Sequence, residues 1–158
     1  MKKGKIFNLL KQGEVVQAFE AADESIDREA ASRELTWFAG LLADLKGHPV
    51  LAKAILLKSI MVNPDLAETC YVLGNVLSMP EMLVEDSDNA LKALYWYDEA
   101  LKRDPSHLDA LHNKALLLLF LGRRGEAEDT FNELLKLEPE HPKYRELGLL
   151  ISAVVKDA

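Results

Sequence analysis

The sequence predicts an all-α fold in which antiparallel helix pairs stack into a solenoid. Two observations support this prediction. Three prolines, Pro64, Pro105 and Pro139, follow one another at intervals of 41 and 34 positions. Each proline closes a segment in which small and apolar residues appear in the same order. Internal repetition at such a period indicates a repeat architecture before any single residue is interpreted.

The repeated order places helix-packing residues in two successive parts of each unit. The clearest unit carries Leu111, Ala115, Leu118, Gly122, Ala127, Phe131, Leu134 and Pro139. The unit before it carries Cys70, Leu73, Gly74, Leu77, Ala93, Tyr97, Ala100 and Pro105, with seven residues added between its helices. The earliest full unit carries Thr36, Ala39, Gly40, Ala43, Gly47, Ala52, Leu56, Ser59 and Pro64. Each unit is therefore predicted to be a helical hairpin.

This pattern resembles the tetratricopeptide repeat (TPR), whose signature is an aromatic or apolar residue, Leu-Gly, an aromatic, and then Ala, Phe and Pro at fixed offsets. The resemblance implies a right-handed α-α superhelix. It is strong over residues 33–141 and weaker outside them. We expect a single TPR-like domain over residues 1–158, divided into a degenerate repeat at 1–32, repeats at 33–66, 67–107 and 108–141, and a capping helix at 142–158.

The spacing also predicts how the two helices of a unit meet. Helices approach closely only where side chains are small. We expect small residues of the first helices to face alanines of the second, pairing Gly40, Gly74 and Ala115 with Ala52, Ala93 and Ala127. A proline forces the residue before it towards extended geometry, so each unit should end at Asn63, Asp104 and Glu138.

The last segment is expected to be one helix that covers the exposed end of the solenoid. Pro142 suits a first helical turn. An apolar stripe on this helix consists of Tyr144, Leu147, Ile151 and Val154. Leu149 and Leu150 widen the apolar arc, which leaves a homodimer contact as a possibility beside simple capping.

Composition favours an intracellular, non-catalytic protein. No apolar run approaches the ~20 residues of a membrane span, so we predict no membrane insertion and a cytoplasmic location. Cys70, the only cysteine, occupies an inward-facing helical position and is expected to be a buried hydrophobe. The four histidines are dispersed, and phosphate-binding glycine loops and nucleophile motifs are absent. We therefore predict no enzyme activity, no metal and no cofactor.

The net charge of −7 is concentrated in the third unit. Between positions 65 and 100 there are eight acidic residues and one basic residue, and the remainder of the chain is neutral. Such a distribution argues against nucleic acid as a partner, because phosphate contacts require a basic stripe. The inserted segment 79–89 has two interpretations. It is either an extension of the first helix followed by a longer, solvated loop, with its apolar residues tucked against the neighbouring unit, or an acidic lip beside the groove that attracts a basic segment and has an adjustable, methionine-rich rim. Ser87 or Asp88 could cap the following helix.

If the units stack as TPR hairpins do, their first helices line a concave groove. The candidate contact residues are those not used for packing: Glu34, Trp37, Leu41, Asp44, Tyr71, Asn75, Asp109, His112, Asn113 and Leu116. Aromatic rings and amides of this kind suit an extended or helical peptide. We therefore predict a scaffold for a segment of another protein, apolar with some basic character. The alternative is a structural subunit that self-associates through the terminal helix or the groove.

One specialised TPR mode is predicted to be absent. Family members that bind the C-terminal carboxylate of heat-shock chaperones use a clamp of two lysines, an arginine and two asparagines. Asn75, Asn113 and Lys143 could occupy three of these places, but Tyr71 and Leu147 stand where two cations would be. Most of the attraction for a double carboxylate is then lost.

Overall fold

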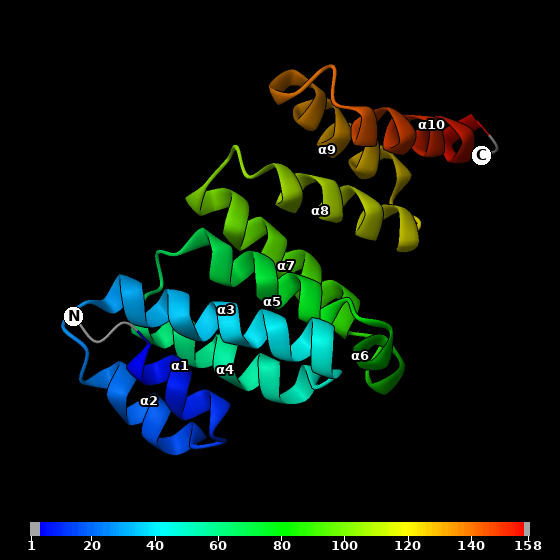
Figure 1. Cartoon of the computed structure of the whole chain (residues 1–158). Coiled ribbons are helices and arrows are strands. Elements are labelled where there is room, and N and C mark those ends of the chain that lie inside the picture. Colours follow the sequence, from blue (N-terminus) through cyan, green and yellow to red (C-terminus); the bar gives the residue numbers. More distant parts are fainter. Residues whose placement is uncertain (1–3, 157–158) are drawn as a thin grey trace.

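The computed structural model describes residues 4–156, and every regular element in this range is a helix. Figure 1 shows the helices following one another in chain order from one end of a curved stack to the other, as expected for a solenoid. The all-α solenoid prediction is confirmed. The helices are α1 (Lys5–Lys11), α2 (Val15–Asp23), α3 (Arg28–Lys46), α4 (Pro49–Val62), α5 (Ala67–Leu77), α6 (Pro80–Glu85), α7 (Asn89–Arg103), α8 (Leu108–Phe120), α9 (Arg124–Leu137) and α10 (Pro142–Lys156).

Helix ends follow from local chemistry. Gly47, at φ 65°, ends α3 in the left-handed conformation that glycine adopts without penalty. Asp27 accepts a hydrogen bond from the backbone N–H of Ala30 and so caps the start of α3. Asn63 and Asp104, each followed by a proline, have extended backbone, as predicted. Glu138 shares their φ but has a ψ of only 74°, so its geometry falls short of the extended region.

The core runs through the stack as layers of apolar side chains. One large cluster joins residues of α1 to α9, from Ile6 to Ala127. A second cluster joins α8 and α9 to α10 through Phe131, Leu134, Tyr144 and Ile151. The apolar stripe of α10 therefore covers the last hairpin, as its spacing predicts, although Val154 is only half-buried. Leu149 and Leu150 are 74% and 48% exposed on the outer side.

The predicted pairing of glycines with alanines is wrong for two of the units. A Cβ on Gly74 would lie 2.6 Å from the Cε1 of Tyr97, so the glycine makes room for an aromatic ring and not for Ala93. At Gly40 the nearest atom to such a Cβ is the Cγ1 of Val72, at 3.8 Å, on the next first helix. The tight contact depends on ring size, which the spacing of small residues does not reveal.

The first interpretation of segment 79–89 is correct in the inward packing of Met79, Met82 and Leu83 and wrong in the extended first helix. The first helix of the unit is not extended. It ends at Leu77, and residues 80–85 form the separate short helix α6. Met82 is buried in the core and Met79 packs against it, so these methionines are not an adjustable rim. Asp88 precedes α7, but its side chain makes no capping hydrogen bond.

A cluster of four hydroxyl groups is buried where α3, α4 and α5 meet. It consists of Ser32, Thr36, Ser59 and Thr69. The Oγ1 of Thr36 lies 2.9 Å from the Oγ of Ser59 and 2.8 Å from the Oγ1 of Thr69. The Oγ of Ser59 also donates to the carbonyl of Ser32, at 2.9 Å. Because each hydroxyl has partners, the cluster joins two neighbouring units without leaving a polar group unsatisfied.

Candidate functional site

Two adjoining pockets lie along the first helices α3, α5 and α8. The α3–α5 pocket, of about 480 Å³, is lined by Arg33, Thr36, Trp37, Gly40, Leu41, Asp44, Leu66, Glu68 and Val72. The α5–α8 pocket, of about 460 Å³, is lined by Asp44, Asn75, Ser78, Leu83, Tyr97, Asn113, Leu116, Leu117 and Phe120. Asp44 lines both pockets, so the two form one continuous groove.

Six of the ten predicted contact residues line this groove. Trp37, Leu41 and Asp44 lie in the α3–α5 pocket, and Asp44 also lines the α5–α8 pocket with Asn75, Asn113 and Leu116. The other four, Glu34, Tyr71, Asp109 and His112, lie outside both pockets. The insertion, for which the sequence left a place beside the groove open, contributes Leu83 to the α5–α8 pocket, and sequence reasoning missed Phe120 at the end of α8.

Glu34 is an internal anchor. Its carboxylate accepts hydrogen bonds from the backbone N–H groups of Gly4, at 2.9 Å, and Phe7, at 3.2 Å. These bonds fix the start of α1 against α3, because the first N–H groups of a helix have no partner within it. The neighbouring Trp37 is 57% exposed, and its ring lies 4.8 Å from that of Phe7. Trp37 thus presents one face to the groove and packs the other against α1.

The amides of the α5–α8 pocket bond to one another. The Oδ1 of Asn75 accepts hydrogen bonds from the hydroxyl of Tyr97 and from the Nδ2 of Asn113, both at 2.8 Å. The same Nδ2 donates to the hydroxyl of Tyr71 at 3.5 Å. Burial raises the pKa of Tyr97 to about 12 and also raises the pKa of Tyr71. We call Tyr71, Asn75, Tyr97 and Asn113 the amide–phenol network. It joins α5, α7 and α8.

The two histidines near this network have structural contacts. His112 is only 8% exposed and lies with its ring 6.0 Å from that of Tyr144 on α10. His107 precedes α8, and its Nδ1 accepts a hydrogen bond from the backbone N–H of Ala110. The Nε2 of His107 lies 3.1 Å from the Oε2 of Glu68. The carboxylate of Glu68 raises the pKa of His107, against the opposing effect of burial.

A third pocket, which sequence reasoning did not anticipate, lies between α1 and α3. This N-terminal apolar pocket, of about 560 Å³, is lined by Phe7, Leu10, Lys11, Gly13, Val15, Phe38, Leu41, Leu42, Leu45, Lys46, His48 and Leu51. Phe38 packs against the core and also lines this pocket. This pocket was not predicted because the N-terminal unit is degenerate. The repeat pattern therefore does not indicate which side chains of α1 pack inwards and which line a surface.

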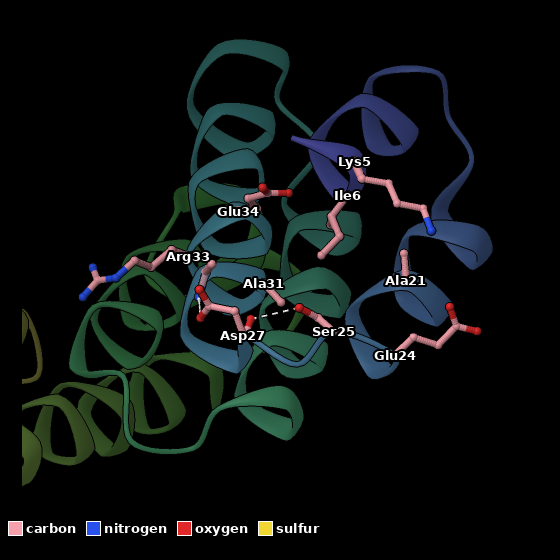
Figure 2. A pocket seen from close by; sticks show the side chains of 10 residues that line it. Lys5, Ile6, Ala21, Glu24, Ser25, Asp27, Ala31, Arg33 and Glu34 are labelled. Atoms are coloured by element: carbon pink, nitrogen blue, oxygen red, sulfur yellow. Dashed lines mark hydrogen bonds between the residues drawn. The ribbon is translucent and has the colours of Figure 1, made fainter. Parts of the chain in front are cut away.

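A fourth cavity lies at the opposite end of α3 and offers no convergent chemistry. Figure 2 shows Arg33 and Glu24 pointing away from one another, while Ile6, Ala21 and Ala31 form the floor between them. Glu34, also seen there, is already bonded to the backbone of α1. Within residues 4–156 no group of three or more His, Cys, Asp or Glu side chains could hold a metal ion. None of the helices in that range has the length and apolar character needed to cross a membrane.

Comparison with known proteins gives consistent results. Residues 86–149 match the model of a family described as tetratricopeptide repeat. A tetratricopeptide repeat and J domain-containing co-chaperone of Fusarium oxysporum f. sp. lycopersici is 30% identical over 96 residues, which are 61% of this chain and 18% of the relative. A TPR repeat-containing protein of Methanocaldococcus jannaschii is 40% identical over 75 residues, 48% of this chain and 22% of the relative. The matched regions are thus about a fifth of each relative's length.

Solved structures are similar over almost the whole chain. A crystal structure of MamA has a TM-score of 0.70 at 15% identity and covers 99% of this chain and 86% of its own. A tetratricopeptide repeat protein from Parabacteroides merdae has a TM-score of 0.69 at 18% identity and covers 97% of this chain and 58% of its own. At these identities the similarity concerns the fold.

Proposed function

Since the chain belongs to the tetratricopeptide repeat family, we propose that it is a non-catalytic scaffold whose groove holds a segment of a partner protein. The observation that carries this proposal is the continuous groove along α3, α5 and α8, joined at Asp44 and lined by six of the predicted contact residues. Concave faces of stacked helical hairpins are extended binding surfaces. The family is typically an interaction module, which also supports the absence of catalysis.

The lining of the groove indicates the chemistry of the segment. Trp37, Leu116 and Phe120 expose apolar surface along it. Asp44 is exposed at the junction of the two pockets, and Glu68 lines the first of them. A segment with apolar anchors and a basic residue near Asp44 fits this lining, because opposite charges steer association and fix register. Arg33 also lines the α3–α5 pocket, but its guanidinium is already paired with the carboxylate of Glu29 at 2.7 Å, so it adds no free positive charge there.

The proposal is tested with a variant that alters the groove without altering the core. Asp44 and Leu116 are both exposed, so the double variant D44K/L116D should fold normally. The full chain is used as bait in its native cell extract, and bound proteins are identified by mass spectrometry. We expect capture of the specific partner to fall by at least about tenfold.

The matched control is D129K/L137D, which makes the same two changes at exposed positions of α9, a second helix of its hairpin. This control should retain the partner, and both variants should keep the melting curve of the parent chain. If the groove variant still captures every partner that the control captures, the groove is not the binding site.

Self-association is a second candidate function, and the exposed Leu149 and Leu150 on α10 favour it. Sedimentation at several concentrations separates the two candidates, because a chain that stays monomeric at high concentration cannot be a self-assembling subunit. If the chain does associate, L149E/L150E should return it to the monomer.

A further inference from the structure

We propose that the N-terminal apolar pocket is a second docking site, and that it takes an apolar, helical segment of a partner protein whose polar residues are acidic. This pocket adjoins the groove at Leu41, which lines both, but its occupant has the opposite charge to the one that Asp44 and Glu68 attract. The proposal stands on the shape of the pocket, the rigidity of its wall and the charge around it.

The pocket has an almost entirely apolar lining. Eight of the side chains that line it are aliphatic or aromatic, and they come from α1, the start of α2, α3 and the start of α4. Leu45, which is 73% exposed, and Leu51, which is 40% exposed, form its outer edge. Apolar surface of this kind is stabilised when another apolar chain covers it. A volume of about 560 Å³ accommodates several leucine-sized side chains.

Aromatic packing makes one wall of the pocket rigid. The ring of Phe7 lies 4.8 Å from that of Trp37 and 5.8 Å from that of Phe38, in tilted and edge-to-face arrangements. Such pairs favour these ring positions by more than the area that they bury accounts for. The backbone N–H of Phe7 is in turn bonded to Glu34 on α3. A preformed wall lowers the entropy that binding must overcome, which favours a specific ligand.

The rim of the pocket is basic. Lys11 and Lys46 are exposed on opposite helices, and the lining residues within the described range include no carboxylate. The ammonium group of Lys11 lies 5.6 Å from the centre of the Phe7 ring, so its charge is held at the pocket mouth. Carboxylates on either side of an apolar anchor therefore complement this site.

Charge also argues against a second copy of the chain as the occupant. The exposed leucines of α10 are the obvious candidates, but that helix also exposes Lys143 and Lys156 against a single Glu146, while Arg145 is paired with Glu140 just before the helix. Two basic rims would repel one another. A membrane surface fits poorly for a different reason, since lipid headgroups accept protruding apolar side chains, whereas this surface is hollow.

The test uses three synthetic helical peptides of about 15 residues, with the same leucine positions and with glutamate, lysine or glutamine at all others. Fluorescence anisotropy measures their binding to the full chain. We expect the glutamate peptide to bind most tightly. In K11E/K46E its affinity should fall by about tenfold, because two attractions become repulsions, and the lysine peptide should become the preferred ligand. L45D should weaken all three peptides.

The chain offers a matched control. Lys11 and Lys46 lie in the last turns of α1 and α3, and Lys156 and Lys136 lie in the last turns of α10 and α9. K136E/K156E therefore has the same net charge and the same effect on helix dipoles, and it should bind the glutamate peptide like the parent. The groove variant D44K/L116D should also keep this binding, so failure of one proposed site is distinguishable from failure of the other.

Several outcomes would overturn the proposal. One is equal binding of the three peptides, or binding of none. Another is an affinity for the glutamate peptide that K11E/K46E and K136E/K156E lower equally. Binding to phosphatidylserine vesicles that K11E/K46E removes, without selectivity among the peptides, would assign the surface to membranes. A dimer that dissociates in L45D would assign it to a second copy of the chain.

Discussion

The α1–α3 and α5–α8 regions place very different chemistry on neighbouring first helices. Between α1 and α3 the surface is an apolar pocket, with Lys11 and Lys46 at its edge. Between α5 and α8 the surface is polar, but Asn75 and Asn113 are bonded to each other and to Tyr97. The comparison teaches that a polar side chain in a groove can be a structural element of the stack. Whether such a side chain is available to a partner depends on its hydrogen bonds within the chain and not on its residue type.

Two glycines at corresponding positions of their units account for part of this difference. Gly74 on α5 lets the ring of Tyr97 approach closely enough for the phenol to reach Asn75. Gly40 on α3 has only ordinary van der Waals space before it, with Val72 at 3.8 Å, and it forms part of the pocket wall. The network therefore depends on one close approach that the α3 unit does not have.

The largest expected effect follows from exchanging these glycines for alanine. In Gly74→Ala the added methyl would lie 2.6 Å from the Tyr97 ring, so the ring must move and its hydrogen bond to Asn75 is strained. We expect a loss of roughly 2–3 kcal/mol in the free energy of unfolding, as for other overpacked cores. Urea denaturation followed by circular dichroism measures it.

Gly40→Ala is the matched control, and its effect should have the opposite sign. The new methyl has space, and alanine is the better helix former, so the chain should gain roughly 0.5–1 kcal/mol. If both variants lose the same free energy of unfolding, the two glycines have the same packing role. The proposed difference between the two regions would then be wrong.

The second prediction concerns alkaline pH and tests the burial of the network. The pKa of Tyr97 is raised from 10 to about 12 in the folded chain. Between these values the folded chain holds a proton that the unfolded chain has lost, so the free energy of unfolding falls as pH rises. The contribution is complete below about pH 10 and is lost by about pH 12, a decrease of about 2–3 kcal/mol.

Unfolding by urea at a series of alkaline pH values measures this decrease. The variant Tyr97→Phe should be less stable at neutral pH, because it lacks the hydroxyl bonded to Asn75, and its stability should decline less between pH 10 and 12. A parallel decline in the two proteins would show that Tyr97 is not the group responsible.

The solenoid was predictable because its determinants are local. A proline restricts the residue before it, and the extended backbone of Asn63 and Asp104 follows from that rule alone. The stripe of Tyr144, Leu147 and Ile151 is buried because a helical period places these residues on one side. Such rules operate within a few residues, so a single sequence contains them in full.

The candidate site was only partly predictable because its determinants are not local. From its position on the first helix, Glu34 is predicted to be a groove residue. Its actual role, to hold the start of α1, depends on a hydrogen bond from the backbone N–H of Gly4, thirty residues earlier. Asn113 likewise bonds to Asn75 across two helices. Apolar residues in the insertion, such as Met82, could pack inwards or form a rim, and helix α6 decides between these positions. The spacing of residues along the sequence does not determine these contacts, because they depend on which helices pack against each other.

The smallest expected effect lies at His107, at the edge of the network. Its pKa is raised because the ring bonds to the carboxylate of Glu68, despite partial burial. A raised folded-state pKa contributes stability that is present below the ordinary value of about 6.5 and is lost as pH rises through the folded-state value. The stability gained when His107 is protonated is limited for two reasons. A protonated Nδ1 can no longer accept the hydrogen bond from the backbone N–H of Ala110. The carboxylate of Glu68 is also half-exposed, so solvent screens its attraction for the charged ring.

A proton titration of the histidine ring signals by NMR should place His107 above a free histidine, and Glu68→Gln should lower its pKa. The apolar pocket contains no such pair, so K11E/K46E should leave the titration of His107 unchanged. If Glu68→Gln leaves the pKa of His107 where it was, the carboxylate is not its cause. The ion pair would then contribute nothing to the contact between α5 and α8, and the amide–phenol network with the apolar packing around it would hold these helices together.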